Sequence, residues 1–96
     1  MRVMIMVEFD TPTANGLITS DRMGSTIEAI MERLHPEAAY FYPRGGRRGV
    51  TLVVDAPDSA ALPGLVEPFW LQLGAHVEAF PCMNADELRE GLSRLA

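Results

Sequence analysis

Residues 38–55, AAYFYPRGGRRGVTLVVD, limit the possible folds of this chain more than any other stretch. Two runs rich in β-branched and aromatic residues flank the Gly45-Gly46 pair, a pattern that predicts a β-hairpin. Tyr40 and Tyr42 lie two residues apart, so they share one face of the first strand. We expect one further strand and helical material on each side of the hairpin.

The N-terminal segment 3–9 is predicted to be a strand that is apolar on both faces. On one face lie Val3, Ile5, Val7 and Phe9, and on the other Met4, Met6 and Glu8. An antiparallel sheet with one solvated face would alternate apolar and polar residues instead. Helices can cover one face of this strand, and a second copy of the chain most simply covers the other. The strand therefore predicts a homodimer.

Two helical regions flank the hairpin. Residues 10–16 have the composition of a loop or a helix entry, and apolar residues recur at helical spacing over 19–34. Two starts compete for this helix, a cap at Ser20-Asp21 and a capping box formed by Ser25 and Glu28. Pro36 ends the helix.

Residues 62–73 continue as a second apolar helical stripe. Pro68 removes an interior hydrogen bond at roughly 3 kcal/mol, so we expect a break or kink at Glu67-Pro68. Residues 75–82 are predicted to be the fourth strand. Asn84 and Glu87 then form a capping box that starts a short last helix.

The predicted order is β-α-β-β-α-β with a C-terminal helix, within one domain, residues 1–96. Right-handed crossovers around a central hairpin lead to a four-stranded antiparallel sheet with helices on one face. This is the ferredoxin-like α+β arrangement. Two apolar sheet faces that meet across a two-fold axis would form a dimeric α+β barrel.

The composition limits partners and location. A net charge of −5 argues against binding to the phosphate backbone of a nucleic acid. The apolar run Val3–Val7 is too short for a signal-peptide core or a membrane span. Cys82 is the single cysteine, so no intrachain disulfide forms, which fits a reducing cytosol. We expect a soluble, cytoplasmic protein without nucleic-acid or membrane partners.

Three segments resemble a known family. They are PEAAYFYPRGGRRG (36–49), EPFWLQLGAHVE (67–78) and PCMNADEL (81–88). These segments are similar to an uncharacterised bacterial family of the dimeric α/β-barrel superfamily. That superfamily includes cofactor-independent quinol monooxygenases, muconolactone isomerase-like enzymes and haem-handling proteins. The resemblance implies the fold and dimerisation, and it supplies no catalytic residues for this chain.

Two groups of polar residues are candidates for a site. Arg44, Arg47 and Arg48 at the hairpin turn could bind an anionic ligand, since guanidinium groups pair bidentately with carboxylates and phosphates. Alternatively, they form a solvated tip or ion pairs to an acidic partner subunit. His76 and Glu78 project from the same face of one strand.

With Tyr40 or Tyr42 nearby, His76 and Glu78 could transfer protons, because histidine titrates near neutral pH. The alternatives are a pair that faces water and a hydrogen bond in the dimer interface. Glu8 is a candidate base if it is buried, although its place at a strand end favours solvent.

The remaining candidates concern apolar ligands and metals. Phe69 and Trp70, with six methionines, could line a cavity for an aromatic ligand or fill a core that has no cavity. His35, before Pro36, is expected to cap a helix. His35, His76 and Cys82 show no spacing typical of metal ligands, and no cofactor motif is present, so we predict neither a metal nor a cofactor.

These observations lead to one main hypothesis and two alternatives. We expect a homodimeric barrel that binds a small apolar or aromatic molecule or serves as an accessory dimer. The first alternative is a cofactor-independent monooxygenase or isomerase that acts on an aromatic or polyketide-like small molecule. The second is a subunit that docks on a larger protein through its C-terminal helix.

Overall fold

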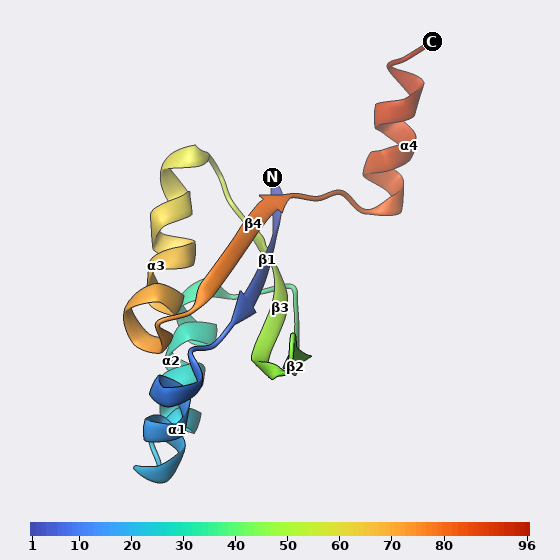
Figure 1. The fold of residues 1–96 in the computed structure, drawn as a ribbon. Helices are drawn as coiled ribbons and strands as arrows, with labels where there is room; N and C mark the ends of the chain where they lie inside the picture. Colours follow the sequence, from blue (N-terminus) through green and yellow to red (C-terminus); the bar gives the residue numbers. More distant parts are fainter.

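The computed structural model describes residues 1–96 and contains four strands and four α-helices (Figure 1). The strands are β1 (Arg2–Glu8), β2 (Ala38–Arg44), β3 (Arg47–Asp55) and β4 (His76–Pro81). The helices are α1 (Thr11–Thr19), α2 (Met23–Leu34), α3 (Leu62–Leu73) and α4 (Ala85–Ser93), with a short 3-10 helix, η1 (Ser59–Ala61), before α3. None of these helices has the length and apolar character needed to cross a membrane.

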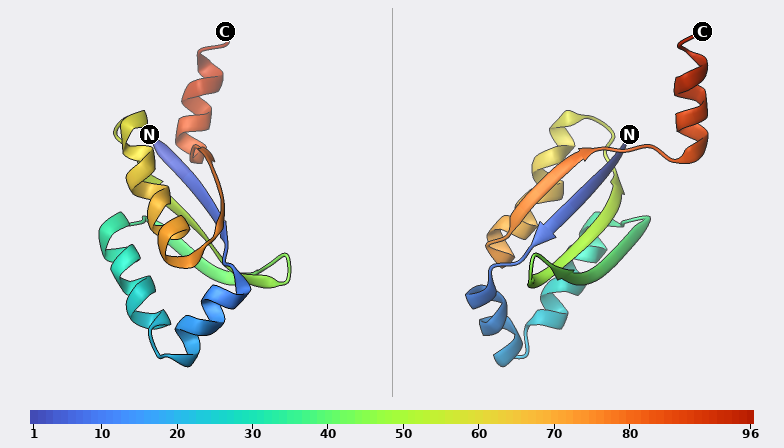
Figure 2. Two further views of the ribbon diagram at one scale, coloured as in Figure 1. Left: turned by 60° about the vertical axis from the view of Figure 1, so that its left-hand side comes forward. Right: turned by 45° about the vertical axis from the view of Figure 1, so that its right-hand side comes forward.

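The strands form one antiparallel sheet in the order β2-β3-β1-β4. The hairpin predicted around Gly45-Gly46 joins β2 to β3, and both glycines have positive φ angles, which a side chain disfavours. Helices α1, α2 and α3 lie on one side of the sheet, while α4 extends past its end (Figure 2). The predicted ferredoxin-like α+β fold is confirmed.

The hydrophobic core lies between the sheet and the three helices. Every second residue of β1 and β3 points toward the helices, because side chains alternate along a strand. These residues are at most 2% exposed: Val3, Ile5, Val7, Val50, Leu52 and Val54. Phe69 and Leu73 of α3 complete this core and are fully buried.

The opposite side of the sheet has no cover. We call it the open face, and the strand register fixes which residues lie on it; besides Arg2, Arg47 and Asp55 at the strand ends, thirteen residues make up its main part. They are Met4, Met6 and Glu8 of β1, Ala38, Tyr40, Tyr42 and Arg44 of β2, Gly49, Thr51 and Val53 of β3, and His76, Glu78 and Phe80 of β4. Met4 lies between Val53 and Phe80 in this register. The apolar second face predicted for the first strand is therefore present and is not covered by a helix.

The first helical region differs from its prediction in extent. Asp10 is the N-cap of α1, and its carboxylate accepts hydrogen bonds from the backbone N–H and hydroxyl of Thr13 at 3.1 and 2.7 Å. The predicted helix entry is therefore correct, but a full helix follows it to Thr19.

Both predicted starts of the next helix are wrong, because α2 begins at Met23. The Ser20 hydroxyl donates back to Gly16 of α1 at 2.7 Å, and the Ser25 hydroxyl donates to the carbonyl of Arg22 at 3.2 Å. Each serine thus donates to a preceding carbonyl, and no side chain caps the start of α2, whose N-cap residue is Arg22. His35 is the C-cap residue of α2, as predicted.

Of the break or kink predicted at Glu67-Pro68, the break does not occur, because α3 is one continuous helix from Leu62 to Leu73. Pro68 is buried next to Phe69. Packing of this face against the sheet compensates for the backbone hydrogen bond that proline cannot make. At the C-terminal end, the predicted capping box of Asn84 and Glu87 is confirmed at the start of α4.

Candidate functional site

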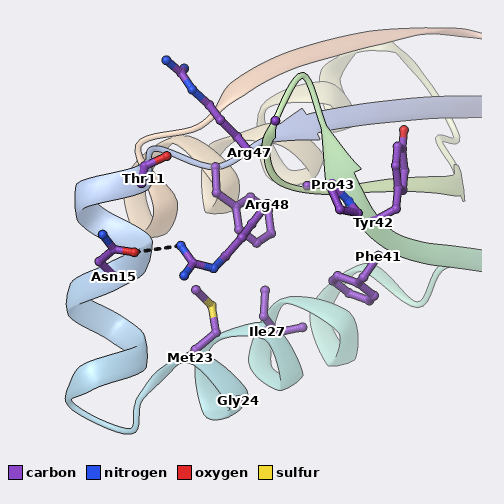
Figure 3. A pocket seen from close by; sticks show the side chains of 13 residues that line it. Thr11, Asn15, Met23, Gly24, Ile27, Phe41, Tyr42, Pro43, Arg47 and Arg48 are labelled. Carbon is purple, nitrogen blue, oxygen red and sulfur yellow. Dashed lines mark hydrogen bonds between the residues drawn. The ribbon is translucent and has the colours of Figure 1, made fainter.

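A cavity of about 850 Å³ opens between the β2–β3 hairpin and helices α1 and α2 (Figure 3). Its size falls within the range typical of small-molecule sites. Apolar side chains from β2, from α2 and from the residue that follows β1 form much of the wall: Phe41, Pro43, Met23, Ile27 and Phe9. Polar lining comes from Thr11, Asn15, Arg47 and Arg48.

The cavity exists because the helix layer does not reach the edge strand closely. Phe41 of β2 points to the helix side of the sheet, since its register partner is the core residue Val50. It is nevertheless 51% exposed. Figure 3 shows Phe41 directed toward the same space as Met23 and Ile27 of α2. An aromatic ring and two aliphatic side chains thus bound a gap that no side chain of this chain fills.

Arg48 brings a positive charge to this gap. Its Nη1 donates a hydrogen bond to Oδ1 of Asn15 at 2.9 Å, which links the hairpin to α1 (Figure 3). A guanidinium has five N–H donors, so this bond leaves others free for a ligand oxygen. Arg48 forms no ion pair with any carboxylate. The neighbouring Arg47 also borders the cavity, but its guanidinium points away from it.

The third arginine of the turn lies on the other side of the sheet. On the open face, Arg44 Nη2 is 3.0 Å from Oε2 of Glu78, and its Nε is 3.6 Å from Oε1 of Glu8. His76 is also present, with Nε2 3.6 Å from Oε1 of Glu78. Both carboxylates raise the pKa of Arg44, although the neighbouring Tyr42 phenol is the main cause.

Tyr42 joins this cluster through its phenol. The hydroxyls of Tyr42 and Thr51 lie 2.6 Å apart. The Thr51 hydroxyl and the Arg44 guanidinium both favour the ionised phenol, so they lower the pKa of Tyr42. Tyr40 is on the same face but is 73% exposed and takes no part in these bonds.

The predicted site residues are therefore divided between two places. Tyr42, His76 and Glu78 gather around Arg44 on the open face, whereas Arg48 lines the cavity. Phe69 and Trp70 lie in neither place, since Phe69 is fully buried in the core and Trp70 is 46% exposed on α3. No group of histidine, cysteine and acidic side chains is arranged to hold a metal ion.

Sequence reasoning did not single out Phe41, Met23, Ile27 and Asn15 as site residues. Met23 and Ile27 belong to a helical apolar stripe, which is equally typical of a core helix. For Phe41 a signal was available, because it alternates with Tyr40 and Tyr42 and must face the opposite side of β2.

The comparisons with known proteins establish the fold. No family model matches the chain, and no curated protein matches it in sequence. It is similar in structure to 5-chloro-2-hydroxyhydroquinone dehydrochlorinase (TftG) from Burkholderia phenoliruptrix AC1100, solved with 2,5-dihydroxybenzoquinone, with a TM-score of 0.67 and 15% identity. The match covers 91% of this chain and 98% of TftG.

Two weaker similarities carry no argument of their own. A formyltetrahydrofolate deformylase from Pseudomonas putida KT2440 has a TM-score of 0.48 and 15% identity over 84% of this chain and 28% of that one. Protein Atu4242 from Agrobacterium tumefaciens has a TM-score of 0.40 and 10% identity over 88% and 96%. At such identities the likeness to TftG shows the fold alone, and the chain has a ferredoxin-like α+β fold.

Proposed function

We propose that this protein is a homodimer that binds a small aromatic molecule in the cavity beneath the hairpin. The observation that carries the proposal is the apolar gap of about 850 Å³ between Phe41 and α2, with Arg48 beside it. An aromatic ring fits between Phe41 and the aliphatic side chains of Met23 and Ile27. An anionic or hydrogen-bond-accepting substituent on that ring would pair with the free N–H groups of Arg48.

The likeness to TftG supports this class of ligand. TftG was solved with 2,5-dihydroxybenzoquinone, a small ring with oxygen substituents, so the shared fold can hold such a molecule. The proposal for this chain still depends on its own cavity, because the two proteins share only 15% of their residues.

The homodimer is proposed from the open face. Met4, Met6 and Val53 lie in its centre, and the larger side chains of Phe80 and Tyr40 lie around them, with 41% and 73% of their surface exposed. An apolar sheet face is stabilised when a second sheet covers it. A second copy of the chain presents the same face, and two-fold symmetry allows the two to pair.

A fluorescence titration tests the binding site. The probes are anilinonaphthalene sulfonate, an aromatic anion, and phenylnaphthylamine, its uncharged relative. Arg48→Gln should raise the dissociation constant of the anionic probe by roughly tenfold or more, because a hydrogen bond to a charged group contributes about 1.5–3 kcal/mol. The same substitution should leave the dissociation constant of the uncharged probe within about twofold of the wild-type value.

Gly24→Leu supplies a steric test with a matched control. Gly24 lines the cavity, and a Cβ there would meet no atom within 4 Å, so a leucine can enter the empty space. Gly16 in α1 is equally unhindered but does not line the cavity. We expect Gly24→Leu to lower the affinity for both probes and Gly16→Leu to leave both affinities unchanged. Equal affinities in wild type and Gly24→Leu would place the probe elsewhere and refute the proposed site.

A second candidate function is a cofactor-independent monooxygenase or isomerase that acts on an aromatic or polyketide-like molecule. The observation that favours it is the cluster of Tyr42, Arg44, Glu78 and His76 on the face that a dimer would enclose. Both reaction classes begin when a proton is removed from a phenol, an enol or the carbon next to a carbonyl.

Proton removal can be measured without a cofactor. Deuterium exchange at the carbon next to the carbonyl of β-tetralone, followed by NMR in heavy water, reports it directly. Wild type should accelerate the exchange, and Tyr42→Phe should reduce this effect by about 10²-fold or more. Tyr40→Phe, on the same face outside the cluster, should retain it. No acceleration by wild type would argue against this second candidate.

A further inference from the structure

Helix α4 is separated from the rest of the molecule. It extends past the end of the sheet and away from the other helices (Figure 1). Its nine residues contribute nothing to the hydrophobic core. An isolated helix of this length is marginally stable in water, even with a good cap. α4 therefore lacks the packing that would normally stabilise such a helix.

The two sides of α4 differ sharply. The polar side is internally paired, with ion pairs from Arg89 to Asp86 and from Arg94 to Glu90. On the other side, Leu88 and Leu92 of the helix, and Leu95 in the turn after it, follow helical spacing and are 46%, 55% and 81% exposed. An amphipathic helix in a folded protein normally buries such a stripe. This leucine side has no partner within the chain.

Contacts at the start of α4 fix the position of its first turn relative to strand β1. The Arg2 guanidinium donates to Glu37 at 2.6 Å and also to Glu87 in the first turn of α4. The backbone N–H of Cys82 donates to the carbonyl of Arg2 at 3.1 Å, and the capping box of Asn84 fixes the helix entry. In this arrangement the leucine side is exposed and is not packed on the chain's own open face.

We infer that α4 is an arm that packs its leucine side on a second copy of the same chain. The inference rests on the homodimer of the proposed function. Two apolar surfaces of this chain lack cover, the open face and the leucine side of α4, and α4 continues directly from the edge strand β4 of that face (Figure 2). A two-fold axis through the open face would cover both, since each copy would give its arm to the other.

Sedimentation equilibrium of two variants, substituted at neighbouring positions of α4, tests whether this helix packs on a second copy. Leu92→Glu places a carboxylate on the leucine side, while Ser93→Glu places the same group on the polar side one residue later. We expect Leu92→Glu to raise the dimer dissociation constant at least about tenfold and Ser93→Glu to change it by less than about twofold. The sheet core should be unaffected in both variants, which near-ultraviolet circular dichroism can verify.

A measurement on the unmodified chain removes any dependence on the folding of variants. In a dimer mixed from isotope-labelled and unlabelled chains, filtered NOE spectra detect contacts between copies only. We expect such contacts from the methyl groups of Leu88 and Leu92. If these intermolecular contacts were absent, or if the methyl groups contacted only their own chain, the proposal that α4 packs on a second copy would be refuted.

The outcomes separate this inference from the proposed dimer. If wild type is a monomer at micromolar concentration, both the dimer and the arm are refuted. If wild type is a dimer, Leu92→Glu has the same dissociation constant and no intermolecular NOE reaches α4, the arm alone is refuted. Weakened association together with intermolecular NOEs from the leucines supports it.

Discussion

Arg44 Nη2 lies 3.0 Å from Oε2 of Glu78, so a side chain of edge strand β2 reaches a side chain of the opposite edge strand β4. The guanidinium passes Glu8 of the central strand β1 on the way, at 3.6 Å. Gly49 of β3 lies beneath this path, where a Cβ would stand 3.1 Å from the Cβ of Arg44. One arginine thus connects the two edges and organises the polar end of the open face.

Gly49→Ala should destabilise the protein. An added Cβ would lie 2.5 Å from the carbonyl oxygen of Val7 as well as close to Arg44, so the central strands would have to move apart. We expect the free energy of unfolding in urea to fall by about 1–3 kcal/mol. Gly16→Ala, in open space within a helix, should instead raise it by up to about 1 kcal/mol. Equal stabilities for Gly49→Ala and wild type would contradict the close packing described.

Thr51→Val should raise the pKa of the Tyr42 phenol. The Thr51 hydroxyl is the main cause of the lowered pKa, and valine keeps the shape of the side chain without the hydroxyl. Ionisation can be followed by the ultraviolet absorbance of phenolate, and the Tyr42→Phe variant identifies which transition belongs to Tyr42. An unchanged titration in Thr51→Val would show that the two hydroxyls do not interact in solution.

Asp10→Asn should make stability less sensitive to acid. Hydrogen bonds from the Thr13 hydroxyl and backbone lower the pKa of Asp10 in the folded protein. A lowered folded pKa contributes stability above the pKa of the unfolded chain, and this contribution is lost as the pH falls through the folded pKa. Asparagine keeps the cap without titrating. The advantage of wild type over Asp10→Asn in urea unfolding should therefore shrink with falling pH, and parallel pH profiles would speak against it.

Phe69→Ala and Trp70→Ala should differ strongly although the residues are adjacent. Phe69 is fully buried in the core, so its removal should lower the free energy of unfolding by about 3–5 kcal/mol. Trp70 is 46% exposed on α3, so its removal should lower it by about 1 kcal/mol or less. Neither variant should change the affinity for the aromatic probes at temperatures where it is folded. A comparable loss of stability in both variants would be inconsistent with the burial seen here.

Phe80→Glu should weaken the proposed dimer. Phe80 is a half-exposed aromatic residue on the open face, and a carboxylate in its place would be desolvated by a second sheet. We expect the dimer dissociation constant to rise at least about tenfold in sedimentation equilibrium. Leu71→Glu is the control, because Leu71 is 78% exposed on α3, outside the open face. If the two variants changed the dimer dissociation constant equally, the proposal that the open face is the dimer interface would be refuted.

Local signals in the sequence were sufficient for much of the fold. The glycine pair of the hairpin and the capping box at Asn84 act over a few residues, and both are found as predicted. Met4 and Met6 also indicated a second apolar sheet face, because strand alternation needs no knowledge of the remaining chain. The start of α2 and the unbroken α3 could not be predicted this way. They depend on how Ser20 bonds to the preceding helix and on how Pro68 packs in the core.

The candidate site was only partly predictable for the same reason. Tyr42, His76 and Glu78 lie on one face by strand parity, but their connection depends on Arg44 crossing two strands. The cavity depends on a gap between Phe41 and α2, which is set by the placement of the helix layer. Arg47 and Arg48 are adjacent in sequence, yet strand alternation sends only Arg48 into that gap.

The most direct test of the proposed function is an NMR titration of the protein labelled with nitrogen-15, with anilinonaphthalene sulfonate as the probe. We predict that the amide shifts that change on binding cluster at Met23–Ile27 and Phe41–Gly49, around the cavity. Arg48→Gln should reduce these changes at equal probe concentration. Shift changes confined to β4 and α4, or no saturable change at the cavity, would contradict the proposal that this cavity binds aromatic anions.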